Sequence, residues 1–363
     1  MESMSSCRPS TSEWRSKLFV GGNLHSLVNY VLNLEFFLKK VIGKCFPIIK
    51  FKHPKSSSES EVIYDTGEIP SIFNFVNSSG TQVDHCFQPR KTVVKNNIVL
   101  DSKIGVVYER GNRLVPSSSS WPINELIRDP YNGSDFLTIF QNLKLTDQSI
   151  YSLLPSNGFY HWLIEDLPRY LIARKHAGSE VKTLIYQGAP QYVRDFCGIF
   201  AIEYIEVPRV FLVPKLILGE KNPETGIPNP LDIKILRDSF LLQENINPRR
   251  KIYVSRTGST RSPIWERELS LKLETIGWHV LQCESMNFKQ QVEVFQNAET
   301  ICGVHGAGLA GIVWARPGTE VIELNENFRS DCFNFLAQLM GHRMRQVSTS
   351  AMTLTEIERL IIQ

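Results

Sequence analysis

The feature that most constrains the fold is residues 300–324, which read T-I-C-G-V-H-G-A-G-L-A-G-I-V-W-A-R-P-G-T-E-V-I-E-L. A short apolar run, 301–304, ends at His305 and a cluster of small residues. A second apolar run, 309–314, follows, and after Pro317-Gly318 comes a third, 320–324. This order predicts a strand, a tight glycine turn, a buried helix and another strand, which together form a βαβ unit of a parallel sheet.

The small residues after His305 predict an anion site. Without Cβ atoms in the way, backbone N–H groups can approach a ligand closely. The helix start behind them adds unpaired N–H groups and the positive end of a helix dipole. We therefore expect a phosphate or pyrophosphate to bind here, against Gly306, Ala307 and Gly308.

Two other interpretations of this stretch stay open. Gly306, Gly308 and Gly311 also spell G-x-G-x-x-G, the dinucleotide fingerprint, with Glu323 placed as a ribose-binding acid. That pattern would make the chain an NAD(P)-dependent oxidoreductase, although such a fingerprint usually opens its domain and here it comes late. The simplest alternative is a packing turn in an α/β sheet.

Composition narrows the classes of protein that need considering. The chain has 363 residues, 42% of them hydrophobic, and a net charge of +3. This length fits two globular domains, and the absence of basic blocks argues against a nucleic-acid partner. The seven cysteines are scattered without a C-x-x-C pair, which indicates neither a zinc site nor a disulfide framework and favours a reducing compartment.

The amino-terminal residues 1–55 form an extension with no predicted signal peptide, because residues 1–16 are polar. Residues 18–38 are apolar but interrupted by polar side chains, so a membrane-spanning helix is not expected. The apolar residues recur at helical spacing and lysines follow them in the sequence, so an amphipathic helix lying on an anionic membrane is one interpretation. A helix packed on the core of the protein is the favoured alternative. We expect a cytoplasmic protein, with peripheral contact to the inner face of a membrane as the variant.

The remaining pattern predicts an α/β fold with parallel sheets. Residues 55–60 look like a linker and 117–120 like an exposed loop. Strands are expected at 61–64, 92–100, 104–108, 183–186, 201–206, 251–255 and 278–282. Helices are expected at 159–176, 191–200, 231–244, 265–275, 288–296, 331–340 and 353–361. The proline- and glycine-rich residues 222–230 mark a crossing between domains.

The stretch N-G-F-Y-H-W-L-I-E-D-L-P-R, residues 157–169, carries a candidate base. On a helix His161 and Glu165 share one face, and a carboxylate that touches an imidazole raises its basicity and fixes its tautomer. Asp166 points elsewhere. The alternative is a histidine packed in the core beside Trp162.

The stretch K-I-Y-V-S-R, residues 251–256, carries candidate phosphate ligands. Arg256 follows a predicted strand, and Arg261 and Glu266 come soon after. Guanidinium groups match phosphate oxygens, so two arginines at a strand end suit a diphosphate. The alternative is a pair of solvated loop arginines.

Taken together, these three stretches resemble glycosyltransferase family 61, which includes capsule-type transferases, xylan arabinosyl- and xylosyltransferases, and O-linked N-acetylglucosaminyltransferases. The resemblance rests on the stretch 157–169, on K-I-Y-V-S-R with R-S-P-I-W-E, and on H-G-A-G-L with P-G-T-E-V-I-E-L. It covers about residues 150–345. The family often has asparagine before the glutamate of the middle motif, where Trp265 stands here.

The resemblance implies a GT-B architecture, two Rossmann-like domains facing across a cleft. It assigns residues 56–225 to an acceptor side, 226–350 to nucleotide-sugar binding and 351–363 to a terminal helix. It implies an inverting transfer from a nucleotide sugar, with UDP expected, to a glycan or lipid-linked glycan in polysaccharide or glycoconjugate biosynthesis, without metal or cofactor. The sequence agrees in having no D-x-D motif, which metal-dependent transferases use.

Under this interpretation Arg256, Arg261 and the turn after His305 neutralise the leaving diphosphate, and Glu323 faces the ribose. The base is His161 oriented by Glu165, or Glu165 itself. A nucleotide-sugar-binding module that has lost catalysis remains an alternative, because Trp265 departs from the family pattern.

Overall fold

The computed structural model describes the following residues: 61–65, 72–87, 90–109, 113–114, 145–155, 158–178, 180–221, 225–241, 250–259, 261–326 and 330–362. The predicted helix at 18–38, the linker at 55–60 and the loop at 117–120 lie outside them. Among the described helices, none combines the length and the apolar character that a membrane-spanning segment needs.

The predicted α/β class with parallel strands is confirmed. A five-stranded sheet contains β11 (Arg250–Val254), β12 (His279–Leu281), β13 (Ala298–Val304), β14 (Glu320–Asn325) and β15 (Arg343–Ser348). Its order is β12-β11-β13-β14-β15, and all of its pairs are parallel. Strand order therefore reverses between β11 and β13, where doubly wound sheets bind ligands at their carboxyl edge.

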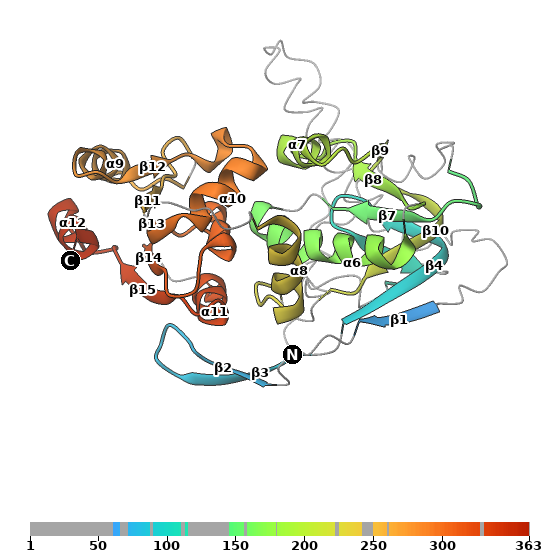
Figure 1. Ribbon diagram of the computed structural model, residues 1–363, viewed down its shortest axis with the longest axis horizontal. Coiled ribbons are helices and arrows are strands. Elements are labelled where there is room, and N and C mark those ends of the chain that lie inside the picture. Colours follow the sequence, from blue (N-terminus) through green and yellow to red (C-terminus); the bar gives the residue numbers. More distant parts are fainter. Residues whose placement is uncertain are drawn as a thin grey trace, which may run out of the picture. The chain divides into compact units, whose positions relative to one another are not determined.

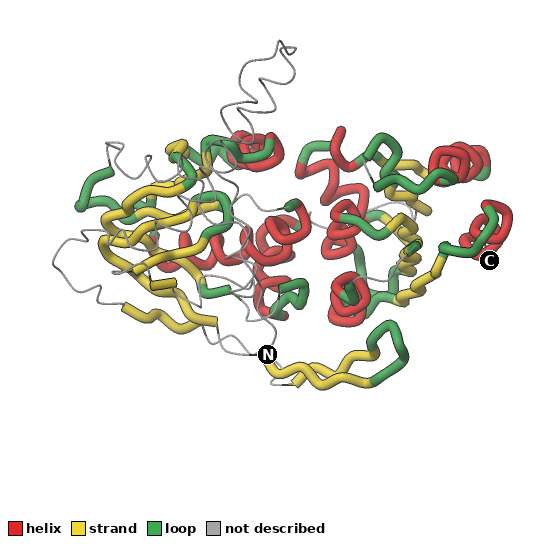
Figure 2. Tube along the Cα trace, turned by 180° about the vertical axis from the view of Figure 1, so that it is seen from behind, coloured by secondary structure: helices red, strands yellow, loops and turns green. Residues whose placement is uncertain are grey.

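Helices cover both faces of this sheet (Figures 1 and 2). Alternate residues point to opposite faces, so Tyr253, Cys302 and Ile322 pack with α9 (Glu266–Thr275) and α12 (Leu354–Ile362). The other face belongs to a cluster with α10 (Phe288–Gln296), α11 (Cys332–Leu339) and η6 (Ala307–Trp314). The η6 segment is the predicted buried helix, and it has the tighter 3₁₀ form. A further 3₁₀ turn, η5, spans Cys283–Ser285.

The second large sheet has eight strands and is mixed, with parallel and antiparallel pairs. Its parallel part, in the order β10-β7-β8-β9, contains β7 (Tyr151–Leu154), β8 (Lys182–Tyr186), β9 (Tyr204–Val207) and β10 (Val210–Gly219). Its antiparallel part contains β1 (Glu61–Asp65), β4 (Arg90–Asp101), β5 (Val106–Glu109) and β6 (Arg113–Leu114). The connection from β4 to β5 is a short turn, which pairs consecutive strands antiparallel, whereas β4 pairs antiparallel with β1 and β10 across longer stretches of chain.

The helical elements beside this sheet begin directly after β7. They are α5 (Phe159–His161), the π-helix η4 (Trp162–Asp166), α6 (Leu167–Ala177) and α7 (Gln191–Ile199). Helix α6 packs on β7 and β10, and α8 (Pro230–Phe240) packs on α6. Asn229 caps α8, its side chain accepting the N–H of Leu231 at 2.9 Å.

A hairpin that the sequence did not indicate, β2 (Ile72–Val76) and β3 (Gln82–Cys86), docks on α11. The backbone N–H of Val76 donates to Gln338 at 2.9 Å, and the Val76 carbonyl accepts from Asn334 at 2.8 Å. Phe75 lies edge-on to Phe335 with 4.8 Å between ring centroids. The hairpin therefore supports the helix whose first turn borders the site described below.

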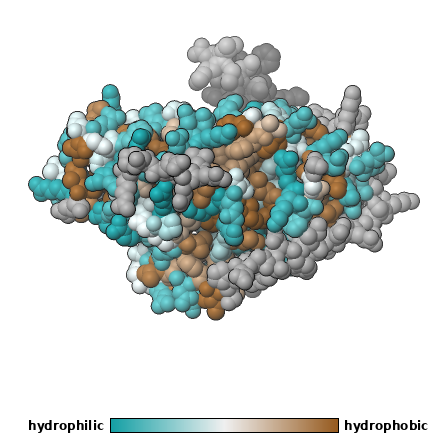
Figure 3. Space-filling model, in the orientation of Figure 1, coloured by the Kyte–Doolittle hydropathy of each residue, from teal (hydrophilic) through white to brown (hydrophobic). Residues whose placement is uncertain are grey.

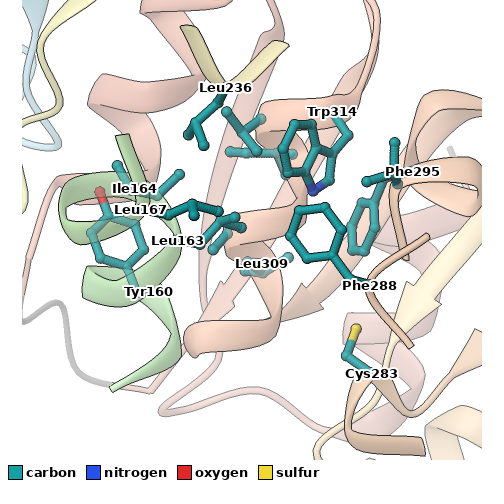
Figure 4. Close-up of a cluster of buried hydrophobic side chains, with 14 of the residues drawn as sticks. Tyr160, Leu163, Ile164, Leu167, Leu236, Cys283, Phe288, Phe295, Leu309 and Trp314 are labelled. Atoms are coloured by element: carbon teal, nitrogen blue, oxygen red, sulfur yellow. The ribbon is translucent and has the colours of Figure 1, made fainter. Parts of the chain in front are cut away.

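A large apolar cluster joins η4, α5 and α8 to η6 and α10 (Figure 4). Leu163, Leu309 and Trp314 are almost fully buried in it. On the face seen in Figure 3, hydrophilic residues are interspersed with smaller hydrophobic areas. The cysteines of the described residues, Cys86, Cys197, Cys283, Cys302 and Cys332, all carry free thiols.

Candidate functional site

The predicted histidine–carboxylate pair forms at the start of the helix after β7. His161 ends α5 and Glu165 lies in the π-helical turn, and the distance from His161 Nδ1 to Glu165 Oε1 is 3.1 Å. The side chain of His161 is 25% exposed, whereas that of Glu165 is 4% exposed. The imidazole can therefore reach a substrate, and the carboxylate lies behind it. Single π-turns of this kind are frequent at functional sites.

The loop after β10 holds the same carboxylate. Gly226 donates its backbone N–H to Glu165 Oε1 at 2.7 Å, and the Thr225 hydroxyl donates to the same oxygen at 3.2 Å. The Thr225 hydroxyl also lies 3.3 Å from His161 Nδ1. Burial alone would raise the pKa of Glu165, but the hydrogen bond from His161, the charge of Lys221 and the Gly226 N–H together hold that pKa below its ordinary value. Glu165 is thus an ionised acceptor that orients His161.

Asp166, the neighbour of Glu165, points away from the pair into a buried charge cluster. Its carboxylate is fully buried, 2.9 Å from Lys221 Nζ and 3.4 Å from Arg169 Nη1. Behind them, Arg90 pairs with Asp232 at 2.8 Å, and both side chains are buried. The chain therefore places several paired charges directly beneath the candidate base.

The predicted arginine lies at the carboxyl edge of the five-stranded sheet. Arg256 follows β11, and its Nη1 donates to the carbonyl of His305, which follows β13. The backbone N–H of Arg256 donates to the buried carboxylate of Glu266, which also accepts the Ser262 hydroxyl at 2.6 Å. Glu266 therefore fixes the loop that presents Arg256.

Arg261 lies in the same loop and is exposed. No carboxylate of the described residues forms an ion pair with it. Burial lowers the pKa of the Arg256 guanidinium, and the positive charge of Arg261 lowers it further. Two cations that repel each other at a sheet edge favour an anion between them.

The glycines of the H-G-A-G-L-A-G run make room for other side chains. A Cβ at Gly306 would lie 2.5 Å from Arg256 Nη1, and one at Gly308 would lie 2.9 Å from Val254 Cγ1. A Cβ at Gly311 would overlap the ring of Phe295. Gly308 and Gly311 are thus needed for packing, and Gly306 leaves the space that the Arg256 guanidinium occupies.

His305 forms a second histidine–carboxylate pair. Its Nδ1 contacts Glu323 Oε1, and Glu323 Oε2 accepts from Gln346 Nε2 at 2.8 Å. Glu323 is fully buried. Both of its oxygens are hydrogen-bonded within the protein, and one of them orients His305. Its contact with a ribose stays a prediction.

Two aromatic rings link the two pairs. Phe333, in the first turn of α11, lies 5.3 Å from His305 and 5.3 Å from Tyr160, measured between ring centroids. Tyr160 in turn lies 5.5 Å from the ring of His161 and donates its hydroxyl to the Gly226 carbonyl at 3.0 Å. The His161–Glu165 pair and the His305–Glu323 pair are therefore connected by the ring contacts of Tyr160 and Phe333.

A family model described as Glycosyltransferase 61 matches residues 159–322, from the first residue of α5 into β14. This part of the chain is therefore similar to glycosyltransferase family 61. A curated relative, a β-1,2-xylosyltransferase from Arabidopsis thaliana, is 37% identical over 79 residues. Those residues make up 21% of this chain and 15% of the relative, so the chain matches only a small part of that protein's length.

The family 61 match includes both edges of the site, namely His161 with Glu165 and Arg256 with His305. It ends one residue before Glu323. The glycine run of this domain follows β13, the third strand of its sheet, whereas a dinucleotide fingerprint follows the first strand of its fold. With its glycines used in packing, this topology weighs against the oxidoreductase interpretation.

The site also contains groups that the sequence did not single out: Lys221, Thr225, Gly226, Tyr160, Phe333 and Gln346. Tyr160 stands inside the stretch 157–169, next to His161, but its type alone indicated no role. The other groups reach the site from a loop, a helix and an edge strand far apart in the chain, and no local motif marks them. Trp265, the departure from the family pattern, is half-buried and packs on the cluster beneath α9. Within the described residues, no group of three or more His, Cys, Asp or Glu side chains gathers as metal ligands would.

Proposed function

We propose that this chain is an inverting, metal-independent glycosyltransferase that moves a sugar from a UDP donor to a hydroxyl of a glycan acceptor. The observation that carries the proposal is the pairing of an arginine-bearing sheet edge with an oriented histidine inside the stretch that matches the family 61 model. We further propose that the two sheets belong to two Rossmann-like domains in a GT-B arrangement, with the donor on the five-stranded sheet.

The donor diphosphate would bind at the carboxyl edge of β11 and β13, where strand order reverses. Arg256 and Arg261 supply positive charge, and the turn Gly306, Ala307 and Gly308 supplies backbone N–H groups. His305, oriented by Glu323, supplies a further donor. Together these groups neutralise the charge that develops on the departing diphosphate, as a divalent cation does in D-x-D transferases.

His161 is the base in this proposal, and Glu165 orients it. The Glu165 carboxylate is nearly buried and accepts hydrogen bonds from the backbone and from Thr225, and its low pKa makes it a poor proton acceptor. The Nδ1 of His161 is engaged with Glu165, so the proton is taken by Nε2.

The chemistry is one displacement. The acceptor oxygen attacks the anomeric carbon from the side opposite the diphosphate and forms the new C–O bond. The bond from that carbon to the diphosphate oxygen breaks, and its electron pair leaves with UDP. The hydroxyl proton passes to His161, and the anomeric configuration inverts.

The xylosyltransferase relative makes a xylose donor the first to test. The acceptor is proposed to be a glycan or a lipid-linked glycan in polysaccharide or glycoconjugate biosynthesis. The intact histidine–carboxylate geometry favours an active enzyme over a binding module.

A thermal-shift panel of nucleotides tests the proposal. A ligand at 100 times its dissociation constant adds about 2.7 kcal/mol of stability, so saturating UDP should raise the melting temperature of a chain of this length by roughly 3–5 °C. Arg256→Ala should abolish most of that shift. Stabilisation by NAD or NADP and none by UDP would contradict the proposal. UDP binding without transfer from any UDP-sugar to glycan acceptors would instead indicate an inactive binding module.

A further inference from the structure

A lysine beneath the candidate base has no role in the proposed chemistry so far. Lys221 follows β10, and only 1% of its side chain is exposed. Its Nζ lies 2.9 Å from Asp166 Oδ1 and 4.0 Å from Glu165 Oε2. A buried ammonium group is costly unless nearby carboxylates compensate it.

Among the residues that the structure describes, the buried charges around Lys221 are equal in number. Three cations and three carboxylates lie buried there: Arg90, Arg169, Lys221, Glu165, Asp166 and Asp232. Five of them pair among themselves through Arg90–Asp232, Arg169–Asp166 and Lys221–Asp166. Glu165 is the member that also contacts His161, and Lys221 is the buried lysine on its far side. Glu165 therefore connects the cluster to His161.

We propose that Lys221 is a positioning residue for the transfer: its ammonium keeps the Glu165 carboxylate charged and turned toward His161. This inference rests on the proposed function, in which His161 takes the acceptor proton. Oε1 of Glu165 faces His161, Thr225 and Gly226, and Oε2 faces Lys221. Hydrogen bonds thus hold Oε1 beside the imidazole, and the Lys221 ammonium, 4.0 Å from Oε2, attracts the other oxygen without a hydrogen bond.

Charge at this carboxylate also depends on its other neighbours. His161 on α5 and Lys221 after β10 act on it directly, and Tyr160 on α5 and Asp232 on α8 feel its charge. The other charged groups packed nearby are Asp166 on η4, Arg169 on α6 and Arg90 on β4. Burial opposes ionisation of Glu165. The attraction of Lys221 is among the effects that hold its pKa below the ordinary value.

A charge-balanced double variant separates positioning from stability. Lys221→Met alone leaves Asp166 short of a cation, and such loss often unfolds a protein. Lys221→Met with Asp166→Asn removes one charge of each sign and keeps the cluster balanced. The matched control is Lys234→Met with Asp238→Asn, an exposed pair on α8 with 68% and 62% of the side chains accessible.

Two measurements report on the ionisation of Glu165. Carbon-13 NMR of labelled glutamate carboxyls, assigned with Glu165→Gln, gives the titration midpoint of Glu165. The acid limb of kcat/KM gives the midpoint of the working pair. Removal of the Lys221 cation favours proton binding, whereas removal of the Asp166 anion opposes it, so the reference is Asp166→Asn alone. Both midpoints should lie at least about one pH unit higher in the balanced variant than in Asp166→Asn. The control should leave both unchanged.

Equal midpoints in the folded double variant and in Asp166→Asn would overturn the inference and leave Lys221 a structural role. If the double variant does not fold, Lys221→Gln, which keeps a hydrogen-bond donor for Asp166, gives the same comparison. The NMR titration needs no turnover, so it decides the role of Lys221 even if no transfer is found. A wild-type protein that transfers no sugar would overturn the proposed function alone.

Discussion

Gly306→Ala should weaken UDP binding without unfolding the protein. The backbone of Gly306 is extended, with φ of 173°, so alanine adds no backbone strain. Its Cβ would lie 2.5 Å from Nη1 and 2.8 Å from Cζ of Arg256. Unstrained contacts need about 3.5–4.0 Å, so the guanidinium has to move by about 1 Å and leave the carbonyl of His305.

The expected magnitude follows from what the displaced guanidinium would bind. A hydrogen bond to a charged group contributes about 1.5–3 kcal/mol. Since 1.4 kcal/mol corresponds to tenfold, the Kd for UDP should rise roughly 10- to 100-fold. Arg256 is only partly buried, so it can swing outward, and the melting temperature should change by less than about 2 °C.

Titration calorimetry with UDP on a double-mutant cycle measures this effect. Gly306→Ala and Arg256→Ala remove the same interaction, so their combination should cost little more than Arg256→Ala alone. Gly198→Ala is the control, because a Cβ there meets nothing within 4 Å. Normal UDP affinity in Gly306→Ala, or effects that add fully in the double variant, would refute the reasoning.

Further predictions concern the base, the core and the metal. His161→Ala and Glu165→Gln should each lower transfer roughly 10²–10⁴-fold with little change in UDP affinity, and full activity in a stable Glu165→Gln enzyme would leave that residue no part in the mechanism. The pKa of Glu165 lies below its ordinary value of 4.5, so the ionised carboxylate stabilises the fold above that pH, and this contribution is lost as the pH falls. In Glu165→Gln the free energy of unfolding in urea should therefore depend less on pH between about pH 5 and 3. Gly311→Ala should cost about 1–3 kcal/mol in the same assay, because its Cβ overlaps the buried Phe295 ring, and Phe295→Leu should relieve part of that cost. EDTA should leave the transfer rate unchanged, since the sequence has no D-x-D, and turnover lost in EDTA and restored by manganese would contradict this.

Elements with strong local signals could be predicted from the sequence. The helix at 288–296 matches α10 at both ends, because Asn287 and Gln290 form a capping box before an apolar periodic run. The strands on either side of the glycine run match β13 and β14 closely. Their apolar residues are bounded by glycine and proline.

Strand β10 was missed because a proline interrupts its apolar pattern. Pro214 lies between paired Val213 and Lys215, opposite Asn97, whose φ of 52° is left-handed. The ladder bond that proline cannot make is lost at this irregular position. A pattern that reads as a loop thus forms one of the longest strands of the mixed sheet.

Only part of the candidate site could be predicted from the sequence, because the other part depends on contacts between distant residues. The spacing of His161 and Glu165 is local, and their contact follows from it. The contacts of Glu165 with Thr225, and of Asp166 with Lys221, join residues more than fifty positions apart. A single sequence carries no signal for such pairs, and a lysine is expected on the surface.

The stereochemistry of transfer tests the central claim most directly. Proton NMR of the reaction between an α-linked UDP-sugar and a glycan acceptor, followed from the first turnover, reports the configuration at the anomeric carbon. An inverting enzyme with His161 as base should give a β-linked product and one UDP for each bond formed. An α-linked product, or no product from any UDP-sugar while the protein turns over a nicotinamide dinucleotide, would contradict the account.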